Sequence, residues 1–224
     1  DSCSDGSAEG GMVLREMDSI ANNAAAMQAD IAAMNASGCT PLSEFMYEAH
    51  QYLSGGRVDY GLNSRTSPSG PLVPSVSSSR QSAPDTGLYQ SPLTTSCQRN
   101  FIVLLTDGIP TADNSADPEI EALTGRTCVG AGSGRCLEEI AQYMYENDLR
   151  PSLDGLQNVT TYTVGFGPEV SGSAGLRNTA AGAGGVFYEA SDTATLSTVL
   201  TNLVRTILAF NTSFTSPAVS VNAL

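Results

Sequence analysis

The feature that most constrains the fold of this chain is a short apolar run, FIVLL, at residues 101–105. The run is too short for a helix, and it ends at Thr106, Asp107 and Gly108. A continuous apolar run of this length is typical of a strand buried on both faces in a parallel sheet. The sequence therefore predicts an α/β fold in which helices cover both faces of a mostly parallel sheet.

Helical and strand patterns alternate after this run. The patterns predict a helix over residues 136–147, a strand over 159–164, a short helix over 176–181, a short strand over 186–188 and a helix over 196–208. The inward face of the last helix is expected to be Leu196, Val199, Leu200, Leu203, Val204 and Ile207. This alternation implies parallel strands joined by crossover helices.

Two helices are predicted before the apolar run. Residues 13–34 carry an amphipathic stripe of Val13, Met17, Ile20, Ala24, Met27, Ile31 and Met34, and Asp18 or Ser19 is a candidate cap for the second half. A second helix is expected after Pro41 and is expected to end near Gly55. Its inward residues are expected to be Leu42, Phe45, Met46, Ala49 and Leu53.

Two stretches are predicted to lie outside the core. Residues 57–96 are rich in Ser and Pro, which predicts a surface insertion, and residues 66–86 are expected to be mobile and dispensable for folding. Residues 210–224 are predicted to form an extended linker. The sequence thus predicts one domain over residues 1–209, followed by this linker.

Charge excludes one class of partner. The ten basic residues are all Arg, and 23 acidic residues give a net charge of −13, so binding to nucleic acid is not expected. No run approaches the roughly 18 to 20 apolar residues of a membrane span, so no transmembrane segment is expected. No signal peptide begins at Asp1, which suggests a mature or cropped chain.

The spacing of the cysteines indicates whether the chain functions in an oxidising or a reducing compartment. Cys128 and Cys136 bracket the Gly-rich stretch VGAGSGR, which predicts a disulfide and an oxidising environment; two unrelated thiols in a cytosolic loop are the alternative. Cys39 and Cys97 are expected not to pair. A zinc site is not expected, because the chain has one His and no CxxC motif.

Two residues are candidates for a cation site. Asp107 follows the apolar run, where open α/β sheets bind their ligands, and its carboxylate suits a hard cation such as Mg²⁺. A turn residue before Gly108 is the alternative for Asp107. Thr40 lies in a turn that leads into a helix, where it is either part of the site or an N-cap.

Three segments together resemble the von Willebrand factor A domain. GCTPL is similar to its threonine loop, FIVLLTDG to its central strand and metal-site aspartate, and GGVFYEASDTATLSTVLTNL to its closing strand and helix. The resemblance implies a Rossmann-like sheet that holds Mg²⁺ or another divalent cation. Thr40 and Asp107 are the two positions that match the family's metal ligands.

A narrower resemblance covers nearly the whole chain. The segments GCTPLSEFMYEAHQYLSG, CQRNFIVLLTDGIPT, NVTTYTVGFG and LRNTAAGAGGVFYEASD resemble the A domain of the PilY or PilC family of type IV pilus proteins. This resemblance implies a non-catalytic, exported bacterial protein at the pilus tip or outer membrane. It also implies roles in pilus assembly, surface adhesion and twitching motility, with pilin, minor pilins and a host or abiotic surface as partners.

The chain departs from the A-domain pattern at one place. A complete domain begins with a strand that ends in Asp-x-Ser-x-Ser, and DSCSD at residues 1–5 has neither that spacing nor a preceding strand. The first strand or strands and the serine ligands are therefore expected upstream of residue 1. With Thr40 and Asp107 alone, the chain is expected to hold Mg²⁺ poorly.

Two other functions remain as alternatives. One is an intracellular A domain that uses its metal site to engage an ATPase or a chaperone. The other is a hydrolase, which lacks support because the chain has no Gly-x-Ser-x-Gly motif. The single histidine, His50, is predicted to be a surface or packing residue of the second helix rather than a catalytic base.

Overall fold

The computed structural model of the chain describes residues 10–34, 39–62, 64–65, 72–96, 98–129 and 132–212. Its helices are α1 (Ile20–Ala33), α2 (Leu42–Ser54), α3 (Asp117–Thr124), α4 (Leu137–Glu146), α5 (Ala174–Gly182) and α6 (Thr193–Thr212). Its strands are β1 (Ser64–Arg65), β2 (Leu72–Val73), β3 (Asn100–Thr106), β4 (Val159–Phe166) and β5 (Phe187–Ala190). Three short 3-10 turns, η1 (Tyr60–Leu62), η2 (Ser77–Ser79) and η3 (Pro168–Val170), complete the described elements.

The central sheet is parallel, as the alternating pattern predicts. Its strand order is β3-β4-β5, and β3 pairs with β4 in register from Asn100 opposite Val159 to Thr106 opposite Gly165. Strands β1 and β2 form a separate antiparallel pair. Since parallel strands end at one edge, the loops after β3, β4 and β5 meet at the carboxyl edge of the sheet.

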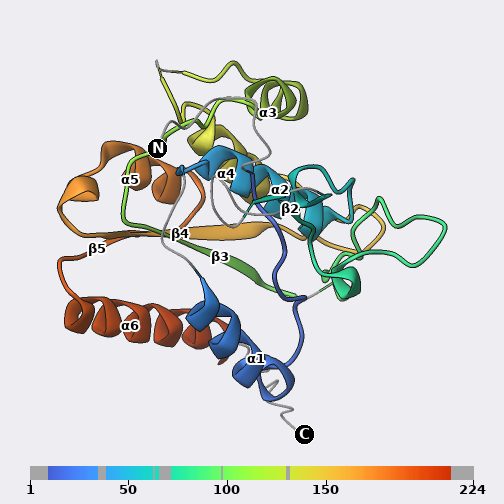
Figure 1. The fold of residues 1–224 in the computed structure, drawn as a ribbon, viewed down its shortest axis with the longest axis horizontal. Coiled ribbons are helices and arrows are strands. Elements are labelled where there is room, and N and C mark those ends of the chain that lie inside the picture. The colour runs from blue at the N-terminus through green and yellow to red at the C-terminus, as the bar shows by residue number, and fades with distance from the viewer. Residues whose placement is uncertain are drawn as a thin grey trace, which may run out of the picture.

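Helices cover both faces of the sheet. Figure 1 shows α2, α4 and α5 on one side, with α3 beyond them, and α6 and α1 on the other. Buried side chains of α2, α4 and α5, including Met46, Ile140 and Leu176, pack in one core with Val159 of β4. On the opposite face, Leu203 of α6 packs against Tyr162 and Val164 of β4.

Strand β3 is less buried than its apolar sequence predicts. Val103 is 39% exposed and Leu105 is 47% exposed, so the expectation of burial on both faces is wrong for this strand. Both side chains point to the sheet face on which α6 packs mainly over β4 and β5, and β3 is the edge strand of the described sheet. Ile102 and Leu104, which alternate with these residues, pack toward the main core.

The first helix is shorter than predicted, and its apolar stripe is not buried. Helix α1 begins at Ile20, because the preceding segment makes distant contacts instead: Val13 N–H donates to Ser75 Oγ at 2.9 Å and Met17 N–H to Tyr52 Oη at 2.8 Å. Ile20 is 73% exposed and is joined on the stripe by the exposed Met17, Met27, Ile31 and Met34.

The predicted surface insertion contributes to the interior. Val58, Tyr89 and Leu93 are fully buried, and Ser75 and Ser79 are each 1% exposed. The expectation of a mobile stretch without buried side chains is therefore wrong for residues 74–80, which hold Ser75 and Ser79. Residues 66–71 of that stretch lie outside the described residues, and its dispensability for folding stays a prediction. The prediction of a loose stretch relied on its low apolar content. The serine hydroxyls of Ser75 and Ser79 are nevertheless buried, because each makes a hydrogen bond.

The remaining predicted elements differ from the structure at particular residues. Phe45 of α2 is 44% exposed and Val204 of α6 is 51% exposed, although both were expected to face inward. Helix α6 extends to Thr212, so the predicted linker does not begin at residue 210. Helix α3 was not predicted, although Pro118 stands in its first turn, where Pro is common.

Candidate functional site

The turn that carries Thr40 is joined to the loop that follows β3. The backbone N–H of Thr40 donates to Thr111 Oγ1 at 3.0 Å, and the N–H of Thr111 donates to the Thr40 carbonyl at 3.2 Å. These two residues form an isolated antiparallel bridge. The contact holds the two chain segments side by side at the carboxyl edge, although 71 positions separate them in the sequence.

Asp107 lies in the turn directly after β3. The Thr106 hydroxyl fixes this turn, since Oγ1 donates to the Gly108 carbonyl at 2.8 Å and accepts from the Gly108 N–H at 3.3 Å. The Asp107 side chain is exposed, and its carboxylate has no hydrogen bond or ion pair with any described residue. Because Thr106 and Gly108 fix the turn, the Asp107 carboxylate is not needed for it and is available for a ligand.

The structure brings the turn of Thr40 and the turn of Asp107 together. A β-carbon placed on Gly108 would lie 3.5 Å from Thr40 Oγ1, so the Thr40 hydroxyl borders the Asp107–Gly108 turn. A hydroxyl and a carboxylate are oxygen ligands of the kind that Mg²⁺ prefers. Two such groups are fewer than the six of an octahedral shell, so the described residues fit part of a cation site.

Asp113 is a structural residue of this edge that the sequence analysis missed. Its buried carboxylate accepts hydrogen bonds from the N–H of Ser43 at 2.8 Å, from Ser43 Oγ at 3.0 Å and from the N–H of Glu44 at 3.3 Å. Burial raises the pKa of Asp113 to about 6, while the bonds from Ser43 and Glu44 oppose that rise. The signal was Pro41 at the N-cap of α2, which has no side chain able to cap the helix.

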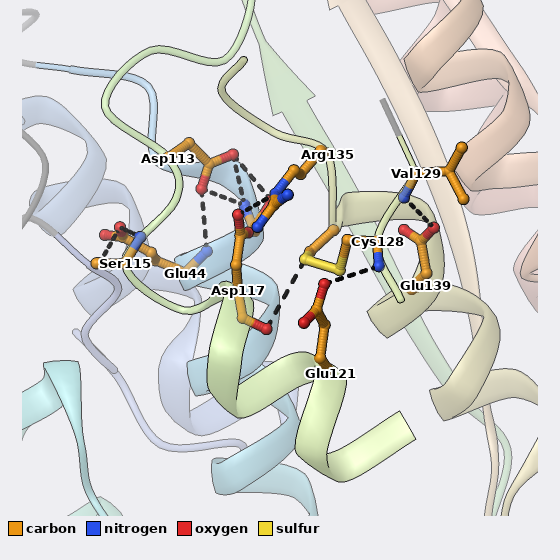
Figure 2. A network of polar contacts seen from close by, with 11 residues as sticks. Glu44, Asp113, Ser115, Asp117, Glu121, Cys128, Val129, Arg135 and Glu139 are labelled. Atoms are coloured by element: carbon orange, nitrogen blue, oxygen red, sulfur yellow. Dashed lines mark hydrogen bonds and ion pairs between the residues drawn. A yellow bond between two sulfur atoms is a disulfide. The ribbon is translucent and has the colours of Figure 1, made fainter. Parts of the chain in front are cut away.

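Glu44 also joins α2 to this loop, but here the helix residue accepts the hydrogen bonds and the loop residue donates them. It is 1% exposed, and its carboxylate accepts from the N–H of Ser115 at 3.3 Å and from the Ser115 hydroxyl. Figure 2 shows Asp113 and Ser115, both from the loop after β3, next to the start of α2. The loop that carries Asp107 is therefore fixed at both Asp113 and Ser115.

The predicted disulfide is confirmed, and it braces this loop. Cys128 and Cys136 are bonded with their Cα atoms 4.9 Å apart. Within the hairpin that they close, the Gly134 N–H donates to the Asp113 carbonyl at 3.0 Å, and Arg135 Nε contacts Asp117 Oδ2 at 2.5 Å (Figure 2). The hairpin thus contacts the same loop that Asp113 joins to α2.

A third cysteine, Cys39, is also disulfide-bonded and adjoins Thr40. The expectation that Cys39 and Cys97 do not pair involves Cys97, which lies outside the described residues. A disulfide next to Thr40 restrains the turn that presents its hydroxyl. Both ends of the candidate site are therefore cross-linked, one through Cys39 and the other through the hairpin.

A cluster of Asp117, Cys128 and Cys136 resembles a metal site by distance alone. Their ligand atoms lie within 4.8 Å of one another. Both sulfurs are bonded to each other in the disulfide, however. Cysteine binds a metal as a thiolate, so neither sulfur is available as a ligand. The Asp117 carboxylate is paired with Arg135. The cluster is therefore structural.

His50 is a packing residue, as the sequence predicts. It is 7% exposed, with the Tyr47 ring at a centroid distance of 6.5 Å and the Tyr143 ring at 5.7 Å. Burial lowers the pKa of His50 to about 4, so the imidazole is neutral near pH 7. An enclosed imidazole between two tyrosine rings offers no support for a hydrolytic site.

Helix α6 is the one described helix that is long and apolar enough to cross a membrane, by length and composition only. Its Leu203 is 1% exposed and packs on the sheet, where Leu196, Val199, Leu200 and Ile207 join it. Because this is one helix and it is only weakly apolar, the described residues contain no clear transmembrane segment.

We found no protein-family model, no curated protein and no solved structure that matches this chain. The function is therefore argued from the fold and the site.

Proposed function

We propose that this chain is a von Willebrand factor A-like, non-catalytic domain of an exported type IV pilus protein of the PilY or PilC kind. Its working surface is the carboxyl edge of the sheet at Thr40 and Asp107. One observation carries the proposal: the Thr40 hydroxyl borders the Asp107–Gly108 turn, and the Asp107 carboxylate faces solvent without a partner among the described residues. This edge is where open α/β sheets bind ligands.

The side chains at this edge suit the binding of a cation better than acid–base catalysis. Its hydrogen-bonded acids, Glu44, Asp113 and Asp117, serve the loop that carries Asp107, because each contacts helix α2, Ser115 or Arg135. The one histidine is buried elsewhere, between Tyr47 and Tyr143. A rigid edge with exposed oxygen ligands supports a divalent cation, Mg²⁺ or a similar ion, that binds a protein or surface group in adhesion and pilus assembly.

The outer side of β3 supports an additional strand from elsewhere in the protein. Val103 and Leu105 are exposed on a strand whose composition suits burial, and no described strand pairs with the outer side of β3. An edge of this kind favours pairing with another strand. A parallel strand at that position ends beside Asp107. Such a strand is the source we propose for the ligands that Thr40 and Asp107 do not supply.

The cysteines favour the exported protein over the intracellular alternative. Cys39, Cys128 and Cys136 are all oxidised in this structure, and disulfides are rare in the bacterial cytoplasm. An A domain that serves an ATPase or chaperone inside the cell does not require these bonds. The periplasm and the cell surface, with pilin or minor pilins as partners, fit them better.

The test uses the full-length protein in cells that carry pili. Asp107→Ala is expected to reduce surface attachment and twitching motility at least severalfold while the protein stays at its normal surface level. The matched control is Asp154→Ala, because Asp154 is an exposed acid in the loop before β4, at the other edge of the sheet. Normal attachment and motility in the Asp107→Ala cells, at normal surface level, would remove this site from the proposal.

A further inference from the structure

Helix α1 carries an apolar stripe that the described elements leave uncovered. Ile20, Met27 and Ile31 are 73%, 42% and 63% exposed, and Met34, directly after the helix, is 57% exposed. The helix makes no extensive contact with any other described helix or strand. A helix of this length draws most of its stability from packing its apolar face against another element. The exposed stripe of α1 is therefore an interaction surface whose partner has to be identified.

Polar contacts, and not the stripe, hold α1 in place. Arg15, in the segment before the helix, forms an ion pair with Asp30 at 2.8 Å. Asn23 Nδ2 donates to the carbonyl of Glu16 at 2.8 Å, and the same segment is bound to α2 through the hydroxyl of Tyr52. These contacts fix the helix without using its apolar side chains, so the stripe is available for packing.

A second uncovered apolar surface lies on the same side of the sheet. Val103 and Leu105 of β3 are half exposed and point to the sheet face on which α6 packs. Val204 and Leu208 of α6 are exposed as well. Figure 1 shows both α1 and α6 on this side of the sheet. Exposed apolar surface that gathers on one side of a protein marks an interaction site.

This uncovered surface carries little charge, in a chain that has 23 acidic and ten basic residues. Strand β3 has no charged residue, α6 has Arg205 alone, and α1 has Asp30 alone, which is paired with Arg15. A charged partner would lose its hydration here without gaining an opposite charge. The composition of the surface therefore favours an apolar, uncharged segment as its partner.

The edge of β3 favours a strand among the apolar partners. No described strand pairs with the outer side of β3, and a strand placed there satisfies the backbone groups that point outward. Helices that pack side by side lie roughly 8 to 10 Å apart, which spans about two strands at a spacing of about 4.8 Å. Since α6 packs over β4 and β5, the next helix on this face belongs over β3 and the strand beyond it.

We propose that the apolar stripe of α1 packs against the strand that pairs with the outer side of β3. The occupant is a β-strand of the same full-length protein, with apolar side chains on the α6 side of the sheet. The inference rests on the additional strand of the proposed function, and it assigns the helix that covers that strand. Helices α1 and α6 then form one layer over an extended sheet.

Oxidation of Met27 by hydrogen peroxide tests the proposal, because exposed methionines form the sulfoxide and enclosed ones are protected. Mass spectrometry compares the rate in the 224-residue chain with the rate in the full-length protein. The proposal predicts oxidation of Met27 at least tenfold slower in the full-length protein. Met46, which is 2% exposed, is the internal control and should react slowly in both. Equal rates for Met27 in the two proteins would overturn the proposal.

Amide hydrogen exchange of residues 100–106 in the same two proteins distinguishes a strand from other covers. A strand on β3 slows exchange of the outward-pointing N–H groups at least tenfold in the full-length protein. Protection of Met27 without this slowing would assign the stripe to a different domain, and protection in the 224-residue chain that rises with its concentration would assign it to a second copy. Either result would contradict the proposal.

Variants of the full-length protein locate the contact. Ile31→Asp places a charge on the stripe and should return the oxidation rate of Met27 to within about twofold of the rate in the 224-residue chain. Ala29→Asp is the matched control, because Ala29 is exposed on the opposite side of the helix and its variant should keep Met27 protected. Wild-type protection of Met27 in Ile31→Asp would contradict the proposal. Asp107→Ala should also keep Met27 protected, so failure of the cation site and failure of this inference are distinguishable.

Discussion

The carboxylate of Asp113 caps helix α2 at the N–H of Ser43, although the two residues are 70 positions apart in the sequence. A distant acid thus replaces the local N-cap that Pro41 cannot provide. The bond positions Thr40, just before α2, against the loop that carries Asp107. The geometry of the candidate cation site therefore depends on a residue that is not itself a proposed ligand.

Loss of this cap should destabilise the fold more than loss of the proposed ligand. Asp113→Ala removes the acceptor of three donors at the start of α2, and we expect it to lower the free energy of unfolding by about 1 to 2 kcal/mol. Asp107→Ala removes no such bond, and its expected change is within about 0.5 kcal/mol. Urea unfolding followed by circular dichroism measures both, and equal losses would refute this division of roles.

The hydroxyl of Tyr89 should stabilise the segment that was expected to be a loose insertion. It donates to Glu48 Oε1 at 2.5 Å and lies 2.8 Å from Ser75 Oγ, and both Tyr89 and Glu48 are buried. Tyr89→Phe leaves the buried carboxylate with one donor fewer, so we expect a loss of about 1 to 3 kcal/mol. Tyr145→Phe, at an exposed ring, is the control, and a Tyr89→Phe protein as stable as that control would contradict the account.

The imidazole of His50 should titrate far below its ordinary range. Its pKa is lowered to about 4 by burial, so the folded protein binds fewer protons than the unfolded chain between about pH 4 and 6.5. The stability that His50 contributes is therefore present above pH 6.5 and is lost as the pH falls, by about 3 kcal/mol at pH 4.

The titration of His50 can be measured directly, because it is the only histidine of the chain. Its ring protons give one NMR titration curve, whose midpoint should lie near pH 4. The overall stability curve is less direct, since Asp113, with a pKa raised to about 6, contributes with the opposite sign. A midpoint near pH 6.5 would show that the imidazole is solvated rather than enclosed between Tyr47 and Tyr143.

The Cys128–Cys136 disulfide should stabilise the fold through its small loop. Closing a loop of this length restricts the unfolded chain by about 2 to 3 kcal/mol. Replacing both cysteines with Ala tests this bond alone, whereas a reductant also acts on Cys39. Thermal unfolding should show the loss in the double variant and little change in Ser133→Ala, a substitution inside the same hairpin. A double variant with wild-type stability would mean that the hairpin is held by Gly134 and Arg135 alone.

The sheet and its helices could be predicted because their signals are local. The β-branched run of β4 and the 3.6-residue spacing of α4 and α6 are visible within single segments. The stripe of α1 shows the limit of such patterns, since Ile20 and Ile31 have helical spacing but lie exposed. Periodicity predicts which residues share a face, and it does not say whether another element covers that face.

The site could be predicted only in part, for a related reason. Thr40 and Asp107 stand in recognisable short motifs, and the structure places their turns side by side. Asp113 and Glu44 act through partners about 70 positions away, and nothing in their immediate sequence indicates those partners. Tyr89 and Ser75 were missed because burial by hydrogen bonding leaves no apolar pattern in the sequence.

The most direct test of the central claim is Mg²⁺ binding by the full-length protein, measured by calorimetry. The account predicts saturable binding of one ion, weakened at least tenfold by Asp107→Ala and unchanged by Asp154→Ala, while the 224-residue chain alone binds poorly. Wild-type affinity in the Asp107→Ala protein, or no Mg²⁺ binding by the full-length protein, would contradict the assignment of a cation site to the carboxyl edge of this sheet.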